Sequence, residues 1–206
     1  MSEHGGHTPA DWDKRYSSSE RIWSGQPNHA LTTEVSGLTP GRALDVGCGE
    51  GADAIWLAQQ GWQVSAIDPS TVALERAQQA AARAGVDISW WLGQLTEVDL
   101  PLGAFDLVSS FYVPLMREHD PLERLFSLVA PGGTLLIVHH ADFPAHHAAH
   151  GHDPEDLAGP ALAAELLSTE NDWTLVVNES RQRPVTGSAG GYEGDDYVVK
   201  AVRASA

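Results

Sequence analysis

The chain of 206 residues has a formal net charge of −16 and 42% hydrophobic residues, enough for one sizeable core, which excludes a disordered chain. No apolar run reaches about 18 residues, so no membrane-spanning helix is predicted. The negative charge repels phosphodiester backbones and no run rich in lysine and arginine offsets it, so we expect neither nucleic acid nor a membrane as partner.

The N-terminal residues and the cysteine content bear on the compartment. Residues 1–10 lack the basic start and the apolar stretch of a secretory signal, so the expected location is the cytoplasm. Cys48 is the only cysteine, so no intrachain disulfide can form. We interpret it as a small residue packed in a tight loop.

The predicted elements begin with two short helices and then alternate between strands and helices. The first helix starts at Thr8 and Pro9, and the second covers 28–36. Strands are predicted at 43–46, 62–68, 86–92, 105–113, 134–138, 173–180 and 196–203, and further helices at 52–60, 70–84, 121–129 and 160–168. The glycine-rich residues 185–195 are expected to form a hairpin or a mobile loop. The alternation predicts βαβ units and an α/β fold with a mostly parallel sheet.

Residues 43–51 read ALDVGCGEG, an apolar run followed by three glycines in five residues. Gly47, Gly49 and Ala52 fit the dinucleotide fingerprint G-x-G-x-x-G/A, in which the backbone approaches a pyrophosphate. Asp45 stands two residues before the first glycine, where its carboxylate repels a pyrophosphate and attracts a cation. A P-loop is excluded because no Lys-Ser or Lys-Thr pair follows the glycines. The loop therefore favours a cationic cofactor over NAD.

An acid followed by G-x-G-x-G, here Asp45, Gly47, Gly49 and Gly51, resembles the first motif of the class I S-adenosylmethionine-dependent methyltransferases. The resemblance implies a Rossmann-like, doubly wound sheet of seven strands with an antiparallel last strand. It also implies S-adenosylmethionine as cofactor and S-adenosylhomocysteine as product. The cofactor carries a sulfonium and an ammonium group, which suit an acid, and glycines let backbone groups approach its methionine portion.

Further motifs extend this resemblance over residues 41–138. The segments FDLV at 105–108 and LVAPGGTLLIV at 128–138 are similar to the family's fourth-strand and fifth-strand motifs. Asp68 ends the second predicted strand, where an acid can accept both ribose hydroxyls, although a turn residue before Pro69 is the alternative. The family usually has Gly-Asp after the third strand to bind the adenine amino group, whereas this chain has glycine followed by Gln94.

The aromatic residues near the N-terminus also resemble a known pattern. The pattern W-D-x-R-Y, followed by Trp23, is similar to the entry segment of small bacterial methyltransferases related to thiopurine and tellurite-resistance enzymes. The resemblance implies that Trp12, Tyr16 and Trp23 cover the methionine end of the cofactor, where a π-face stabilises a sulfonium. Core packing of an aromatic stripe is the alternative. The expected cofactor contacts are Trp12, Tyr16, Trp23, Asp45, Gly47, Cys48, Gly49, Gly51, Asp68, Pro69, Gln94, Leu95 and Ser110.

Residues 139–153 hold six of the ten histidines and follow the fifth predicted strand, at the carboxyl edge of the sheet. His139 or His140 can take a proton from a substrate hydroxyl or thiol. If the stretch is helical, His146 and His150 share a face and can ligate zinc or nickel. A solvated loop without either role is the third hypothesis, and we assign no metal.

The expected protein is a single domain over 1–206, with a helical lid at 1–40, a cofactor-binding core at 41–138 and a substrate-side segment at 139–206. Its expected function is methyl transfer from S-adenosylmethionine to a small molecule by in-line displacement, with His139, His140 and Tyr112 as the candidate catalytic residues. A non-catalytic S-adenosylmethionine-binding protein and an NAD-dependent oxidoreductase are the alternatives. The sequence does not indicate an oligomeric state.

Overall fold

The computed structural model describes residues 8–149, 153–183 and 194–205. Nearly all of the predicted glycine-rich loop, together with His150 and His152, lies outside these ranges. The strands are β1 (Arg42–Val46), β2 (Gln63–Asp68), β3 (Ser89–Leu92), β4 (Phe105–Phe111), β5 (Val129–His140), β6 (Trp173–Gln182) and β7 (Asp195–Arg203). The helices are α1 (Pro9–Ser17), α2 (His29–Val35), α3 (Ala52–Gln59), α4 (Thr71–Ala84), α5 (Pro121–Leu128), α6 (Phe143–Ala149) and α7 (Pro160–Thr169), with a 3₁₀ turn at Pro154–Asp156.

The strands form one sheet in the order β3-β2-β1-β4-β5-β7-β6. The pairs β3-β2, β2-β1, β1-β4 and β4-β5 are parallel, whereas β7 is antiparallel to both β5 and β6. Only β7 therefore runs against the other strands. The predicted doubly wound, mostly parallel sheet with an antiparallel last strand is confirmed.

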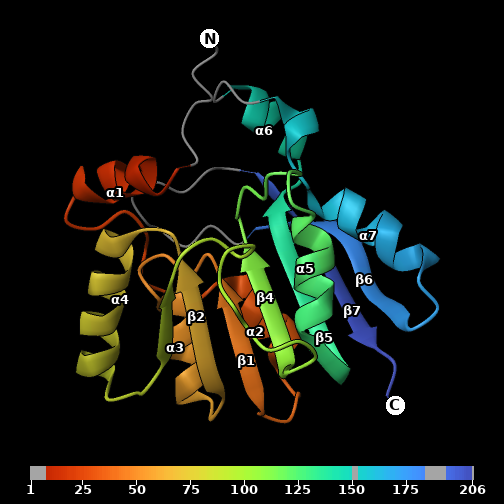
Figure 1. Cartoon of the computed structure of the whole chain (residues 1–206), viewed down its shortest axis with the longest axis horizontal. Coiled ribbons are helices and arrows are strands. Elements are labelled where there is room, and N and C mark those ends of the chain that lie inside the picture. The colour runs from red at the N-terminus through yellow and green to blue at the C-terminus, as the bar shows by residue number, and fades with distance from the viewer. Residues whose placement is uncertain (1–7, 150–152, 184–193, 206) are drawn as a thin grey trace.

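Helices cover both faces of the sheet, and two further helices, α1 and α6, lie at its carboxyl edge (Figure 1). One core joins α2, α3 and α4 to one face, with Leu31, Leu57 and Ala81 among its buried members. The second core joins α5 and α7 to the opposite face through Leu125 and Leu167. Helices α1 and α6 lie beyond the carboxyl ends of the parallel strands, with α1 next to α4 and α6 next to β5 (Figure 1). Both are thus placed beside the ligand-binding edge of an open α/β sheet.

Local sequence signals explain where helix α4 begins and ends. The Ser70 hydroxyl accepts the backbone N–H of Ala73, so Ser70 is the N-cap predicted from the sequence. Gly85 ends the helix in the left-handed region at φ +69°. This helix therefore has the predicted bounds because both of its caps are encoded locally.

Several strand ends differ from the prediction, and those of β4 and β5 bear on the site. Strand β5 begins at Val129 and continues through His140, so His139 and His140 lie inside a strand rather than in a segment that follows it. The reason is tertiary, because these two histidines pair with Tyr197 and Asp196 of β7. Strand β4 ends at Phe111, two residues earlier than predicted, since Tyr112 has a φ of +55° that extended backbone does not adopt.

Within the described ranges, no helix has the length and apolar character needed to cross a lipid bilayer.

Candidate functional site at the carboxyl edge of the sheet

The glycine loop connects β1 to α3 and folds into a compact turn. Gly47, Gly49 and Gly51 have φ values of +70°, +52° and +83°, a region that L side chains rarely adopt. A Cβ at Gly47 would lie 2.3 Å from Cγ2 of Val113, and one at Gly49 would lie 2.7 Å from the Tyr16 hydroxyl. The glycines are therefore required both by conformation and by the close approach of neighbouring side chains.

Gly47→Ala is expected to destabilise the protein more than Gly85→Ala. The two glycines have nearly the same φ, +70° and +69°, but an added Cβ at Gly85 meets nothing within 4 Å. We expect a loss in the free energy of unfolding of about 1 kcal/mol for Gly85→Ala, from left-handed strain alone. For Gly47→Ala we expect about 3 kcal/mol, since overpacking against Val113 adds to that strain. Urea unfolding of both variants measures the difference. Equal losses in the free energy of unfolding would contradict the contribution from overpacking against Val113.

Asp45 is buried directly below the loop, with 2% of its surface exposed. Its Oδ1 accepts the hydroxyl of Ser109 at 3.1 Å, whereas its buried Oδ2 has no hydrogen-bond partner. Burial raises the pKa of this carboxyl well above its usual range, and the charges of Asp53 and Asp68 raise it further. A buried, unpaired carboxylate oxygen is costly, so Asp45 is suited to a ligand that brings a cationic donor.

Two more carboxylates border the loop. Oδ2 of Asp68 accepts the backbone N–H of Gly49 at 2.8 Å, and its Oδ1 accepts that of Ser70 at 2.9 Å. Asp53 accepts the backbone N–H of Asn28 at 2.6 Å. Burial raises the pKa of Asp68 to about 6 and that of Asp53 to about 6. The loop is thus surrounded by negative charge, which suits a cation and opposes a pyrophosphate.

The predicted aromatic residues gather over the loop from α1 and the chain that follows it. Tyr16 is 4% exposed, and its hydroxyl accepts the indole N–H of Trp23 at 3.1 Å. The Trp12 and Tyr16 rings lie 6.3 Å apart between centroids. The Arg15 guanidinium lies 5.4 Å from the ring centroids of both Trp12 and Trp23. Tyr16 and Trp23 therefore lie beside Gly49, Trp12 lies next to Tyr16, and Trp23 remains 43% exposed.

The remaining candidate cofactor contacts lie around the same edge. The amide nitrogen of the Gln94 side chain donates to Glu97 at 3.4 Å, and Leu95 and Ser110 are buried. Pro69 directly follows β2. Cys48 is half-buried, and burial raises the pKa of its thiol well above the usual range, which keeps it protonated. This agrees with the interpretation of Cys48 as a small packed residue.

Tyr112 and the two predicted histidines meet residues from β7 and its neighbourhood. The Tyr112 hydroxyl donates to Asp196 at 2.8 Å, and the Arg183 guanidinium lies 4.9 Å from the Tyr112 ring centroid. Arg183 also pairs with Asp196. Sequence reasoning missed Asp196 and Arg183, because antiparallel pairing of a distant strand brings them here. It also missed Ser109, although a polar residue in an apolar strand pattern was a usable signal.

The hydrogen bonds fix the tautomers of His139 and His140. Nδ1 of His140 lies 3.0 Å from a guanidinium nitrogen of Arg183, which can only donate. Nδ1 of His139 accepts the backbone N–H of His140 at 2.9 Å, and its Nε2 lies 3.3 Å from Nε2 of His147. Each neutral ring therefore carries its proton on Nε2. Burial lowers the pKa of His139 to about 2 and that of His140 to about 4, so both rings are neutral at pH 7.

The histidine-rich stretch forms helix α6 over Phe143–Ala149, which packs against the end of β5. His150, the proposed partner of His146 in a metal site, lies outside the described residues. Among the residues that are described, no group of three or more His, Cys, Asp and Glu side chains is placed to hold a metal ion.

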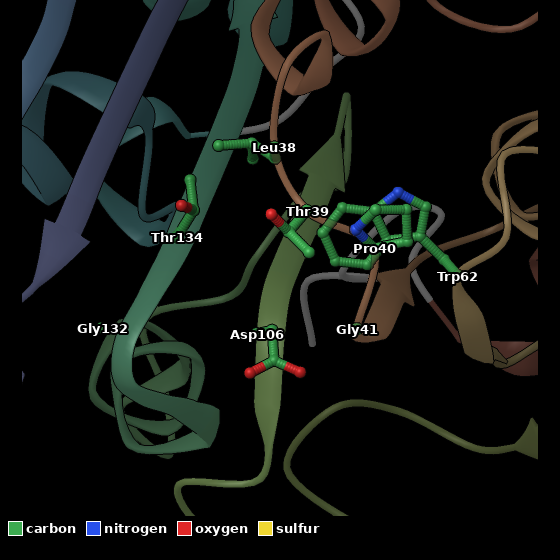
Figure 2. A pocket seen from close by; sticks show the side chains of 8 residues that line it. All are labelled: Leu38, Thr39, Pro40, Gly41, Trp62, Asp106, Gly132 and Thr134. Carbon is green, nitrogen blue, oxygen red and sulfur yellow. The ribbon is translucent and has the colours of Figure 1, made fainter.

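A hollow of about 370 Å³ opens at the opposite, amino edge of the sheet (Figure 2). Leu38, Trp62, Asp106 and Thr134 are among the residues that line it. The Asp106 carboxylate accepts the backbone N–H of Arg42 at 2.7 Å and so stabilises the start of β1. None of the predicted site residues lies here, and the candidate site is the carboxyl edge.

Known proteins resemble this chain in sequence and in fold. Residues 43–133 match a family model described as a methyltransferase domain. An uncharacterized methyltransferase of Mycobacterium tuberculosis is 41% identical over 98 residues, which cover 46% of this chain and 48% of the relative. The ribosomal RNA small subunit methyltransferase C of Alcanivorax borkumensis is 33% identical over 115 residues, 51% of this chain and 34% of the relative.

The chain thus spans at most about half the length of these relatives. Among solved structures, the N-methyltransferase NodS from Bradyrhizobium japonicum, in complex with S-adenosyl-L-homocysteine, superposes with a TM-score of 0.65. Its sequence identity is 20%, with 96% of this chain and 89% of NodS covered, and this similarity concerns the fold. The strand order and the glycine loop agree with the predicted fold, and residues 43–133 are similar to a methyltransferase domain.

Proposed function

We propose that the protein transfers a methyl group from S-adenosylmethionine to a small-molecule acceptor. The observation that carries this proposal is the buried Asp45, whose Oδ2 lacks a partner at the strand end below the glycine loop. A ligand with an ammonium group supplies the missing donor, and the surrounding Asp53 and Asp68 favour a positive charge. NAD, the alternative cofactor, brings a pyrophosphate to the same acidic loop, which opposes it.

Different residues of this chain would bind different parts of the cofactor. Asp45 and the glycine loop would hold the methionine end, with Trp12, Tyr16 and Trp23 above it. Asp68 would accept the ribose hydroxyls, since each carboxylate oxygen has a second lone pair beyond its bond to a backbone N–H. Gln94 and Leu95 would border the adenine, and Pro69, Cys48 and Ser110 would complete the walls. When bound, S-adenosylmethionine supplies an electrophilic methyl group, so alignment is the main task of the protein.

The acceptor side is formed by Tyr112, His139 and His140. A base role for the histidines needs a free lone pair, but both Nδ1 atoms accept hydrogen bonds and both Nε2 atoms carry protons. This arrangement opposes a base role, and His139 and His140 would instead form part of the wall of the acceptor site. It favours an acceptor that ionises readily by itself, such as a thiol, over an alcohol. A relationship to thiopurine or tellurite-resistance methyltransferases is part of this proposal.

The proposal that the acceptor is a small molecule rests on the net charge of the protein. Relatives named as ribosomal RNA and tRNA methyltransferases match the same core. The net charge of −16 repels RNA, and the sequence contains no basic run that would offset this repulsion. We therefore propose a cytoplasmic enzyme with a small substrate.

Calorimetric titration with S-adenosylmethionine, S-adenosylhomocysteine and NAD tests the cofactor. We expect micromolar binding of the first two and none of NAD, and binding of NAD alone would overturn the proposal. Transfer of radiolabelled methyl groups to thiols, phenols, amines and short RNAs then tests the acceptor. Faster transfer to RNA than to every small acceptor would contradict a small-molecule substrate. Tight cofactor binding without transfer to any acceptor would favour the non-catalytic alternative.

A further inference from the structure

Glu50 lies within the glycine loop and binds a segment that comes much earlier in the chain. Its Oε2 accepts the backbone N–H of Trp23 at 3.1 Å and that of Ile22 at 3.3 Å. Residues 18–28 form neither helix nor strand, so these amides have no ladder or helix to satisfy them. The Glu50 side chain is only 10% exposed, which makes the carboxylate an internal anchor for this segment.

Arg76 of α4 reinforces the same attachment. One guanidinium nitrogen donates to Oε1 of Glu50 at 2.9 Å, and the other donates to the carbonyl oxygen of Ser19 at 2.7 Å. The pair thus ties the segment at both of its ends, at Ser19 and at residues 22–23. Bonds in which one partner is charged are stronger than neutral ones and are costly to lose when partly buried.

The tied segment positions the aromatic residues over the loop. Trp23 follows Ile22 directly and donates its indole N–H to the Tyr16 hydroxyl, which lies against Gly49. A second carboxylate, that of Asp13, accepts the Ser70 hydroxyl and the Val72 backbone N–H, and so holds α1 on the start of α4. Asp13 fixes the helix, whereas the chain after it depends on Glu50 and Arg76.

We propose that Glu50 and Arg76 form a latch that holds residues 19–23, and with them Trp23, closed over the glycine loop and so slows the release of bound cofactor. The inference rests on the proposed function, because the ligand under the segment is S-adenosylmethionine or S-adenosylhomocysteine. Glu50 acts here as a positioning residue, since its carboxylate is engaged by protein donors.

The test compares Glu50→Gln with Glu20→Gln, which removes the same charge from an exposed position on the segment itself. Stopped-flow displacement gives the dissociation rate of S-adenosylhomocysteine, and hydrogen exchange gives the protection of the amides of residues 22 and 23. We expect Glu50→Gln to release the ligand about tenfold faster and to lose the protection, and Glu20→Gln to match the wild type. Arg76→Gln should act in the same direction, and the double variant should add little, because the two residues form one unit.

The possible outcomes distinguish a failure of the latch proposal from a failure of the proposed function. Faster release together with faster exchange in Glu50→Gln and Arg76→Gln supports the latch. Unchanged release or unchanged exchange in these variants, with circular dichroism that shows a folded protein, overturns it. A folded wild type that does not bind S-adenosylhomocysteine overturns the proposed function, and the latch with it, and this result is visible before any variant is made.

Discussion

Asp45→Asn is expected to lower the affinity for S-adenosylmethionine about a hundredfold and to leave the stability of the ligand-free protein unchanged or higher. The affinity falls because a charge-assisted hydrogen bond of about 1.5–3 kcal/mol is lost. The stability does not fall because the carboxylate is buried with an unpartnered oxygen among other acids, and the amide relieves that cost. Calorimetric titration and urea unfolding measure the two effects.

Asp106→Asn is the matched control, because it removes a carboxylate at the amino edge of the sheet. It weakens the bond to the Arg42 backbone and is expected to lower stability slightly without a change in affinity. If Asp45→Asn retained wild-type affinity, Asp45 would not hold the methionine end. If it unfolded the protein, its role would be structural.

Cofactor affinity is expected to fall at least about tenfold between pH 7 and pH 5. Burial raises the pKa of Asp53 and of Asp68 to about 6, so both groups take up protons in this range when no ligand is bound. A cationic ligand binds the ionised carboxylates, so protons compete with it below pH 6. Titrations at half-unit pH steps check this, and an affinity that is constant down to pH 5 would contradict it.

The stability of the ligand-free protein is expected to change much less over the same range. Asp53 and Asp68 have folded pKa values above their usual 3.8, so the folded state binds more protons between about pH 4 and 6, and their contribution grows as the pH falls. His139 and His140 have folded pKa values below their usual 6.5, so the unfolded state binds more protons there. Their contribution is lost as the pH falls, and the two effects oppose each other.

Burial also raises the pKa of Asp45, whose contribution has the same sign as those of Asp53 and Asp68. Urea unfolding at pH 7 and pH 5 measures the net effect of these five groups. Substitution of His139 and His140 by Asn should remove the opposing contribution and leave a ligand-free protein that is more stable at pH 5 than at pH 7. An unchanged pH dependence in that double variant would show that the histidines titrate normally.

Most of the sheet was predictable because its strands are short apolar runs bounded by local stop signals. Ser70 and Gly85 marked both ends of one helix, and Gly47, Gly49 and Gly51 marked the loop, since each signal acts within a few residues. The end of β5 was not predictable in the same way. His139 and His140 look like loop residues, and only pairing with β7 makes them part of a strand.

The sequence by itself determined the fold class and the position of the glycine loop with Asp45, because these depend on residue type and short-range spacing. The tertiary structure alone decided which side chains meet that loop. Glu50 binds a segment 27 and 28 residues earlier, and Tyr112 binds Asp196, 84 residues later. No local pattern encodes such contacts, because they arise only when strands distant in sequence are brought to one edge of the sheet. The same long-range packing sets the pKa values of the buried acids and histidines, so the chemistry of the site belongs to the folded protein.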